Sequence, residues 1–95
     1  MVVRMTMNAE WIEIDGERVV QDLQAARETL DTAQGDVVLD FSSVRRIDPN
    51  ALRAMEKLAG LADGKTVKVV LRGVNVDIYK VLKLVKLTSR FSFLA

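Results

Sequence analysis

Two nearly continuous apolar runs, separated by a segment of helical period, constrain the fold of this chain most strongly. The runs are DVVLDF at residues 36–41 and TVKVVL at residues 66–71. Short apolar runs of this kind are typical of strands covered on both faces, as in a parallel sheet. Because parallel strands need a long crossover, usually a helix, the segment between the runs is expected to supply one.

Three segments carry apolar residues at helical spacing and are predicted to form helices. The first runs from about Val19 to Ala33 and is stopped by Gly35. The second begins after Asp48 and ends near residues 63–64, and the third is capped by Asn75. The residues expected to face the core are Val19, Leu23, Ala26 and Leu30 in the first helix, Leu52, Met55, Leu58, Ala59 and Ala62 in the second, and Ile78, Val81, Leu82 and Val85 in the third.

Strand-like residues also occur at both ends of the chain. Residues 2–7 and 11–14 are predicted to form an N-terminal hairpin, and residues 91–94 a short last strand. The predicted order is β-β-α-β-α-β-α-(β). The expected fold class is α/β, with a small, mostly parallel mixed sheet, an N-terminal hairpin and flanking helices, in a single domain over residues 1–95.

Composition removes several classes of function. The chain has no Cys and no His, so thiol nucleophiles, His bases and Cys/His zinc sites are excluded. We expect no metal, no cofactor and no enzymatic activity. A net charge of +1 gives no reason to expect nucleic-acid binding. No apolar run approaches the roughly 20 residues of a membrane span, and no signal peptide is recognised, so we expect a cytoplasmic protein that does not insert into membranes.

The stretch IDPNALRAMEKL, residues 47–58, contains the only proline of the chain. Asp48 is predicted to be the N-cap of the second helix, because its carboxylate can accept hydrogen bonds from free N–H groups of the first turn. Pro49 then falls at the first helical position, where a missing N–H costs nothing. The start of a helix after a strand lies in an exposed loop, where a binding surface is also plausible.

Residues 36–58 and the segment GKTVKVVLRGVNVDIYKVLKLVKL resemble the STAS domain, a family that includes anti-sigma-factor antagonists and the cytoplasmic domains of sulfate transporters. In the antagonists, an Asp-Ser-Ser/Thr-Gly motif starts the second helix, and its first Ser is phosphorylated by an anti-sigma kinase. Asp48 matches the Asp of that motif, Pro49 the phosphoacceptor, Asn50 the next hydroxyl residue and Ala51 the Gly. The resemblance therefore implies a docking surface without its phosphoacceptor, and no phosphorylation is expected at Pro49.

Within the family, the length and the stretch LRGVNVDIYKVLKL are similar to the small STAS subunit of bacterial phospholipid-transport ABC transporters, which docks on the ATPase through the same helix start. This is the alternative to a regulator resembling an anti-sigma-factor antagonist. A superficial similarity to response-regulator receivers, with Asp40 as phosphoacceptor, is disfavoured because Asp15 and Glu17 lie in a hairpin rather than after a first parallel strand.

We therefore predict a non-catalytic protein-interaction module that binds an anti-sigma factor or kinase-like protein, or an ABC ATPase. Ser42 and Ser43 are predicted to be turn residues, and a displaced phosphosite there stays open. Like charges around the helix start suggest an acidic partner surface. A homodimer formed through exposed sheet edges also stays open. The predicted partner-binding residues are Asp40, Ser42, Ser43, Arg45, Arg46, Asp48, Pro49, Asn50, Arg53 and Lys57.

Overall fold

The computed structural model describes residues 9–65 and 67–94 of the chain, in which strands and helices alternate. The elements are β1 (Glu10–Glu13), α2 (Val19–Thr32), β2 (Val37–Asp40), α3 (Pro49–Asp63), β3 (Val69–Arg72), α4 (Val76–Leu84) and β4 (Ser92–Leu94). Each predicted helix is present, and each predicted strand that falls in the described residues is present within a few positions. None of the described helices is both long enough and apolar enough to cross a membrane.

The described strands form one sheet in the order β1-β2-β3-β4, and every neighbouring pair is parallel. The strand predicted at residues 11–14 is β1, which pairs with β2. The partner strand of the predicted N-terminal hairpin, residues 2–7, lies outside the described residues. The predicted small α/β fold with parallel strands is therefore confirmed, and the alternation of strands and helices in the sequence accounts for it.

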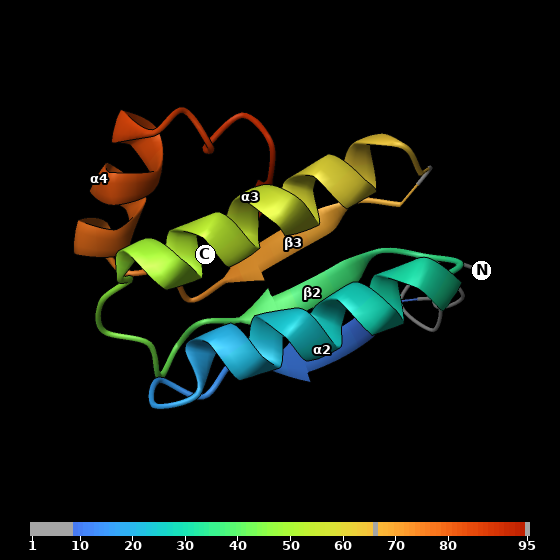
Figure 1. The fold of residues 1–95 in the computed structure, drawn as a ribbon, viewed down its shortest axis with the longest axis horizontal. Coiled ribbons are helices and arrows are strands. Elements are labelled where there is room, and N and C mark those ends of the chain that lie inside the picture. The colour runs from blue at the N-terminus through green and yellow to red at the C-terminus, as the bar shows by residue number, and fades with distance from the viewer. Residues whose placement is uncertain (1–8, 66, 95) are drawn as a thin grey trace.

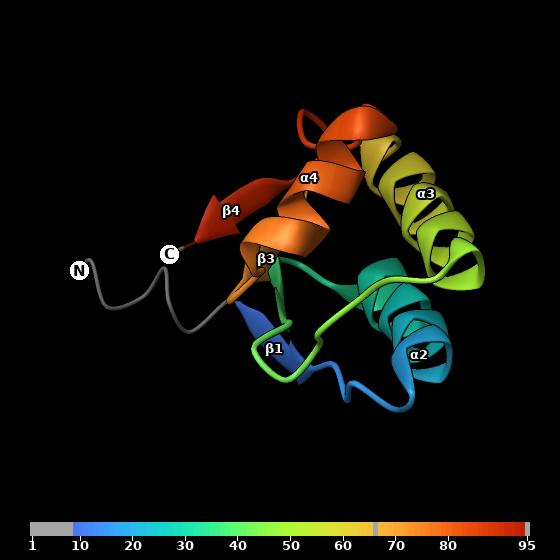
Figure 2. The same ribbon diagram turned by 90° about the vertical axis from the view of Figure 1, so that its left-hand side faces the viewer.

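Helices α2 and α3 lie side by side on one face of the sheet, with α4 beside the end of β3 (Figures 1 and 2). The core between these layers contains Leu23, Leu30, Met55 and Leu58, all essentially inaccessible to solvent. Leu39 of β2 pairs in register with Leu71 of β3, and both are fully buried. Each such leucine stabilises the fold by about 1.5–3 kcal/mol relative to an exposed one.

The predicted core faces of α2 and α3 are confirmed, with Val19, Leu52 and Ala62 half-buried at their margins. In α4, Ile78 and Leu82 are buried and Val81 is half-buried. The prediction for Val85 was wrong, because this side chain is 41% exposed. The reason is that α4 ends at Leu84, so Val85 is the C-cap residue and no longer follows the helical repeat.

Candidate functional site

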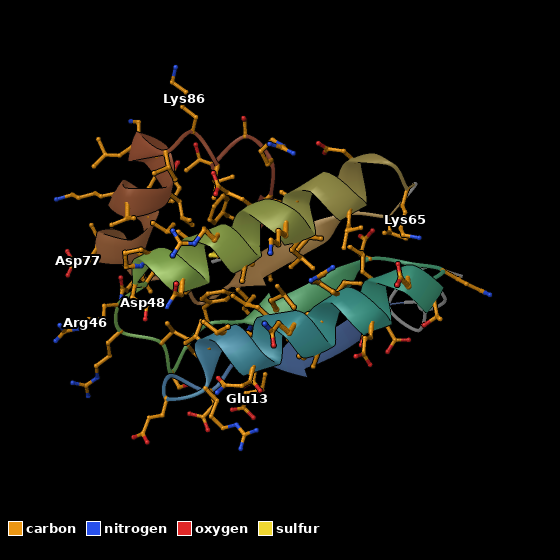
Figure 3. The ribbon with its side chains drawn as sticks, in the orientation of Figure 1. Glu13, Arg46, Asp48, Lys65, Asp77 and Lys86 are labelled. Atoms are coloured by element: carbon orange, nitrogen blue, oxygen red, sulfur yellow. The ribbon has the colours of Figure 1, made fainter. Side chains whose placement is uncertain are left out.

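The loop of residues 41–48 joins β2 to α3 at the end of the sheet where the parallel strands finish. Figure 3 shows Arg46 and Asp48 at this end of the molecule together with Asp77, whereas Lys65 lies at the opposite end. The carboxyl ends of neighbouring parallel strands bring their connecting loops together, which is why binding sites of open α/β sheets form there. The predicted residues of this loop are therefore exposed on one surface.

The start of α3 has the predicted cap. The Asp48 Oδ1 atom accepts a hydrogen bond of 2.8 Å from the backbone N–H of Ala51. Pro49 occupies the first helical position and is exposed. The guanidinium Nη2 of Arg53 donates to the Asn50 Oδ1 atom at 2.7 Å, which holds this arginine over the first turn. Asp48 and Pro49 thus start the helix through a capping hydrogen bond and a proline at the first helical position. Both residues are exposed because the helix begins at the surface.

Asp40, at the end of β2, is fixed by its neighbours on both sides. Its Oδ1 atom accepts from the backbone N–H of Ser42 at 3.0 Å, and its Oδ2 atom lies 3.3 Å from Arg72 Nη1. Hydrogen bonding from Ser42, with a smaller contribution from the Arg72 charge, lowers the pKa of the Asp40 carboxyl below its ordinary value. Asp40 therefore stays ionised and stabilises the turn at Ser42. Ser42 was predicted to be a turn residue.

The loop backbone is tied to the two loops beside it. The Ser43 hydroxyl donates to the carbonyl of Ile14 at 3.0 Å. From the other side, the Asn75 Nδ2 atom donates to the carbonyls of Val44 at 3.4 Å and Arg45 at 3.0 Å. The same Asn75 caps α4 by accepting from Ile78 N–H at 2.8 Å. One asparagine therefore starts a helix and anchors the loop that carries the candidate site.

Two glycines allow the neighbouring loops to approach this closely. A Cβ atom on Gly16 would collide with the carbonyl oxygen of Ser43. A Cβ atom on Gly73 would lie 3.0 Å from Ser42 Cα and 3.1 Å from Ser42 N, and Gly73 has a φ of +72°. Both glycines are thus required by backbone-to-backbone contact, and Gly73 also by its left-handed conformation.

The predicted cationic cluster is divided between two hollows of the surface. Arg45 and Arg46 line one of about 400 Å³, together with Asp15, Gly16, Glu17 and Ser43. Arg53 and Lys57 line another of about 410 Å³, which lies between α2 and α3. Asp40 lines neither, because it is turned to Arg72. The second hollow is also lined by Arg27 of α2, which was not predicted from the sequence. The helical pattern shows which side of α2 faces the core, but not which of its polar sides lies beside another helix.

The two acids of this arrangement form structural hydrogen bonds. Asp40 and Asp48 each accept a backbone N–H, which is the ordinary role of an acid at a turn or a cap. Across residues 9–65 and 67–94, no group of three or more His, Cys, Asp or Glu side chains is placed to hold a metal ion. What the geometry offers is an exposed set of charged and polar side chains on a well-anchored backbone.

A family model described as Mlab, STAS domain, matches residues 2–92. The chain belongs to this STAS family. STAS domains generally mediate protein–protein interactions. The family resemblance inferred over residues 36–91, with a looser fit of the first 35 residues, is therefore confirmed, and the family model covers nearly all of the N-terminal part as well. A comparison with curated proteins found no match.

Two solved structures with different descriptions share the fold of this chain. A protein of Wolinella succinogenes described as a sulfate transporter family protein superposes with a TM-score of 0.73 at 19% identity, covering 90% of this chain and 76% of that one. A proposed anti-sigma factor antagonist of Thermotoga maritima superposes with a TM-score of 0.68 at 20% identity, covering 90% of this chain and 72% of that one. At this level of identity the two structures establish the fold of this STAS domain alone.

Proposed function

We propose that this STAS domain is a non-catalytic module that binds a partner protein through the α3-start surface. We define this surface by the ten residues predicted from the sequence: Asp40, Ser42, Ser43, Arg45, Arg46, Asp48, Pro49, Asn50, Arg53 and Lys57. The observation that carries the proposal is the combination of exposed charged side chains with a loop backbone anchored by Ser43 and Asn75. A rigid backbone lowers the entropy lost when its side chains are ordered by a partner.

The proposed surface is not switched by phosphorylation at the helix start. Pro49 stands where antagonists of the family carry their phosphorylated serine, and a proline has no hydroxyl to modify. Asn50, the next position, engages Arg53 through its amide oxygen. Of the nearby hydroxyls, Ser43 donates to the Ile14 carbonyl, which favours a structural role over a displaced phosphosite. Binding through this surface is therefore constitutive in our proposal.

Two classes of partner fit the proposal. The first is an anti-sigma factor or related kinase, as the similarity to antagonist-type STAS domains suggests. The second is the ATPase of a phospholipid-transport ABC transporter, on which the small STAS subunit docks through the same helix start. The description of the matching family, Mlab, STAS domain, favours this second class. We place this protein in the cytoplasm as part of the same proposal. Homodimer formation through the sheet edges stays a prediction.

The two classes are tested by affinity purification of the tagged full chain from its source, with identification of bound proteins by mass spectrometry. We expect an ABC ATPase or an anti-sigma factor, and we expect Arg46→Glu to lower the affinity by more than about tenfold, because a repulsive charge is placed on the contact surface. Lys83→Glu on α4 makes the same charge change outside the ten residues of the α3-start surface and should retain binding. Equal loss in the two variants, or in neither, contradicts the location that we propose.

The absence of a switch has its own test. The wild-type chain is incubated with ATP and an anti-sigma kinase that phosphorylates an antagonist-type STAS domain, which serves as the positive control. We expect no phosphate on residues 42–51 by mass spectrometry, because the acceptor position is Pro49. Phosphate on Ser42 or Ser43 would show that the acceptor has moved along the loop rather than disappeared.

A further inference from the structure

The flanks of α2 and α3 that face each other at the surface enclose a groove, which we call the α2–α3 groove. Its volume is about 410 Å³, and the two helices lie side by side along it (Figure 1). The floor is formed by Val20 and by Ala54, which is 9% exposed. The polar residues that line it are Gln21, Gln24, Arg27, Asn50, Arg53 and Lys57.

The charges of this groove are all positive. Arg27, Arg53 and Lys57 line it, and no carboxylate does. Within residues 9–65 and 67–94, the ion pairs are Lys65 with Asp31, Arg72 with Asp40 and Arg90 with Asp63, and none of the three groove cations takes part in one. Arg53 and Lys57 are also four residues apart on one helix, a spacing at which like charges repel. The fold therefore keeps a positive groove that its own carboxylates do not neutralise.

The cations come from both walls of the groove and, on α3, from successive turns of the helix. Arg53 and Lys57 are four residues apart on α3, slightly more than one turn and about 6 Å along the helix axis, and Arg27 comes from the other wall. The Asn50 oxygen holds the Arg53 guanidinium near the first turn. Cations on successive turns can each pair with one carboxylate of an acidic segment that lies along the groove. No aromatic residue lines the groove to stack a nucleic-acid base.

Toward the C-terminal end of α2, the charges at the surface between α2 and α3 are no longer all positive. The next hollow in that direction is lined by Arg27, Glu28 and Asp31, together with Gln24 and Leu61. A bound acidic chain would be attracted by the α2–α3 groove and repelled by Glu28 and Asp31 in the hollow beyond it. The groove contains Asn50, Arg53 and Lys57, which also belong to the α3-start surface. The groove is therefore continuous with the surface where we place the partner.

We propose that the α2–α3 groove receives an acidic segment of the partner protein, with Arg27, Arg53 and Lys57 contacting its Asp or Glu carboxylates. The inference rests on the proposed function, because it supplies the chemistry of the partner at the α3-start surface and extends the contact onto α2. It assigns a binding role to Arg27, which lies outside that surface. The attraction should be weakened by salt, since the groove is open to solvent.

A fluorescein-labelled oligo-glutamate peptide tests the groove directly, with oligo-glutamine as the uncharged counterpart. We expect the full chain to bind oligo-glutamate at low salt, to bind it less at high salt, and not to bind oligo-glutamine. The double variant Arg27→Gln/Arg53→Gln should lower the affinity about tenfold, as expected for lost charge pairs. The matched variant Lys80→Gln/Lys83→Gln removes the same charge from α4 and should change the affinity less than about twofold.

Three outcomes would overturn the inference. If the two double variants weaken oligo-glutamate binding equally, the peptide is attracted by the net charge of the protein and not by the groove. Binding of inorganic phosphate that shifts the amide NMR signals of Arg27, Arg53 and Lys57 would make the groove a phosphate site. Recruitment of the chain to phosphatidylglycerol vesicles, lost in Arg27→Gln/Arg53→Gln, would make it a lipid-headgroup site. Circular dichroism of each variant shows whether helix content is retained.

The identified partner separates this inference from the proposed function. If Arg46→Glu and Arg27→Glu both reduce partner binding, both proposals are supported. If Arg46→Glu reduces it and Arg27→Glu does not, the acidic-segment inference is wrong and the α3-start surface stands. If neither reduces it, the partner binds elsewhere and both proposals fail. Because Arg27 is exposed and makes no ion pair with a described carboxylate, its substitution should leave the fold intact.

Discussion

The loop of residues 41–48 and the outer face of α4 lie at the same end of the molecule. Different interactions hold the two segments in place. The loop has no helix or strand, yet Ile14 and Asn75 hold its backbone from two sides. Helix α4 is regular, yet it leaves Val76 68% exposed and Leu84 82% exposed. The comparison shows that a segment of this surface can be held in place without regular secondary structure. Tertiary hydrogen bonds fix the loop, whereas α4 depends on its two buried residues, Ile78 and Leu82.

The sharpest test of the α4 half of this comparison sets two leucines against each other. Leu82 is fully buried and Leu84 is 82% exposed, although they are two residues apart on one helix. Leu82→Ala should lower the free energy of unfolding by about 3 kcal/mol, because it leaves a cavity. Leu84→Ala should change it by less than about 0.5 kcal/mol. Urea denaturation followed by circular dichroism measures both, and similar losses would mean that the outer face of α4 is covered.

The loop half is tested by Gly73→Ala. The added Cβ would crowd Ser42 and would force a φ of +72° on a residue with a side chain. We expect a loss of about 2 to 3 kcal/mol in the free energy of unfolding. Gly60→Ala is the matched control, because its Cβ would meet nothing within 4 Å and the position lies inside α3. That control should be neutral or stabilise by up to about 1 kcal/mol. Equal effects would show that the loops can separate at no cost.

Asn75 links the two regions, and its two roles can be separated by substitution. Asn75→Ala removes the cap of α4 and the donor to the loop carbonyls, and should cost about 1 to 2 kcal/mol of unfolding free energy. Asn75→Asp keeps the acceptor for Ile78 N–H but removes the donor to Arg45. It should therefore be less destabilising, while hydrogen exchange at loop residues 44 and 45 increases as much as in Asn75→Ala. If the loop amides exchange unchanged in both variants, Asn75 does not anchor the loop.

The smallest expected effect is the pH dependence contributed by Asp40. Its pKa in the folded chain is lowered from the ordinary value of 3.8, chiefly by hydrogen bonding from Ser42. A lowered folded-state pKa stabilises the fold above the unfolded value, and this stabilisation is lost as pH falls below 3.8 through the folded pKa. The stability difference between wild type and Asp40→Asn, measured by urea denaturation, should therefore shrink on acidification. A difference that is constant from neutral pH to below the folded pKa would contradict the ionised role.

Local chemistry explains which parts of the site were predictable. Asp48, Pro49 and Asn75 were assigned as helix-starting residues because a cap depends on a few consecutive positions, and the structure confirms all three. The apolar faces of α2 and α3 were predictable from their period. Val85 was misassigned because the sequence pattern continues past the last turn while the helix does not.

The sequence by itself determined the order of strands and helices, the helix caps and the STAS resemblance. Each of these depends on residue types at short spacing, through hydrogen bonds and periodicities that act within a few turns. Only the tertiary structure decided that Gly16 and Gly73 must lack side chains, and that Arg27 joins Arg53 and Lys57 in one groove. The reason is physical: these contacts join segments far apart in the chain, and their geometry is set by how the helices and loops pack on the sheet.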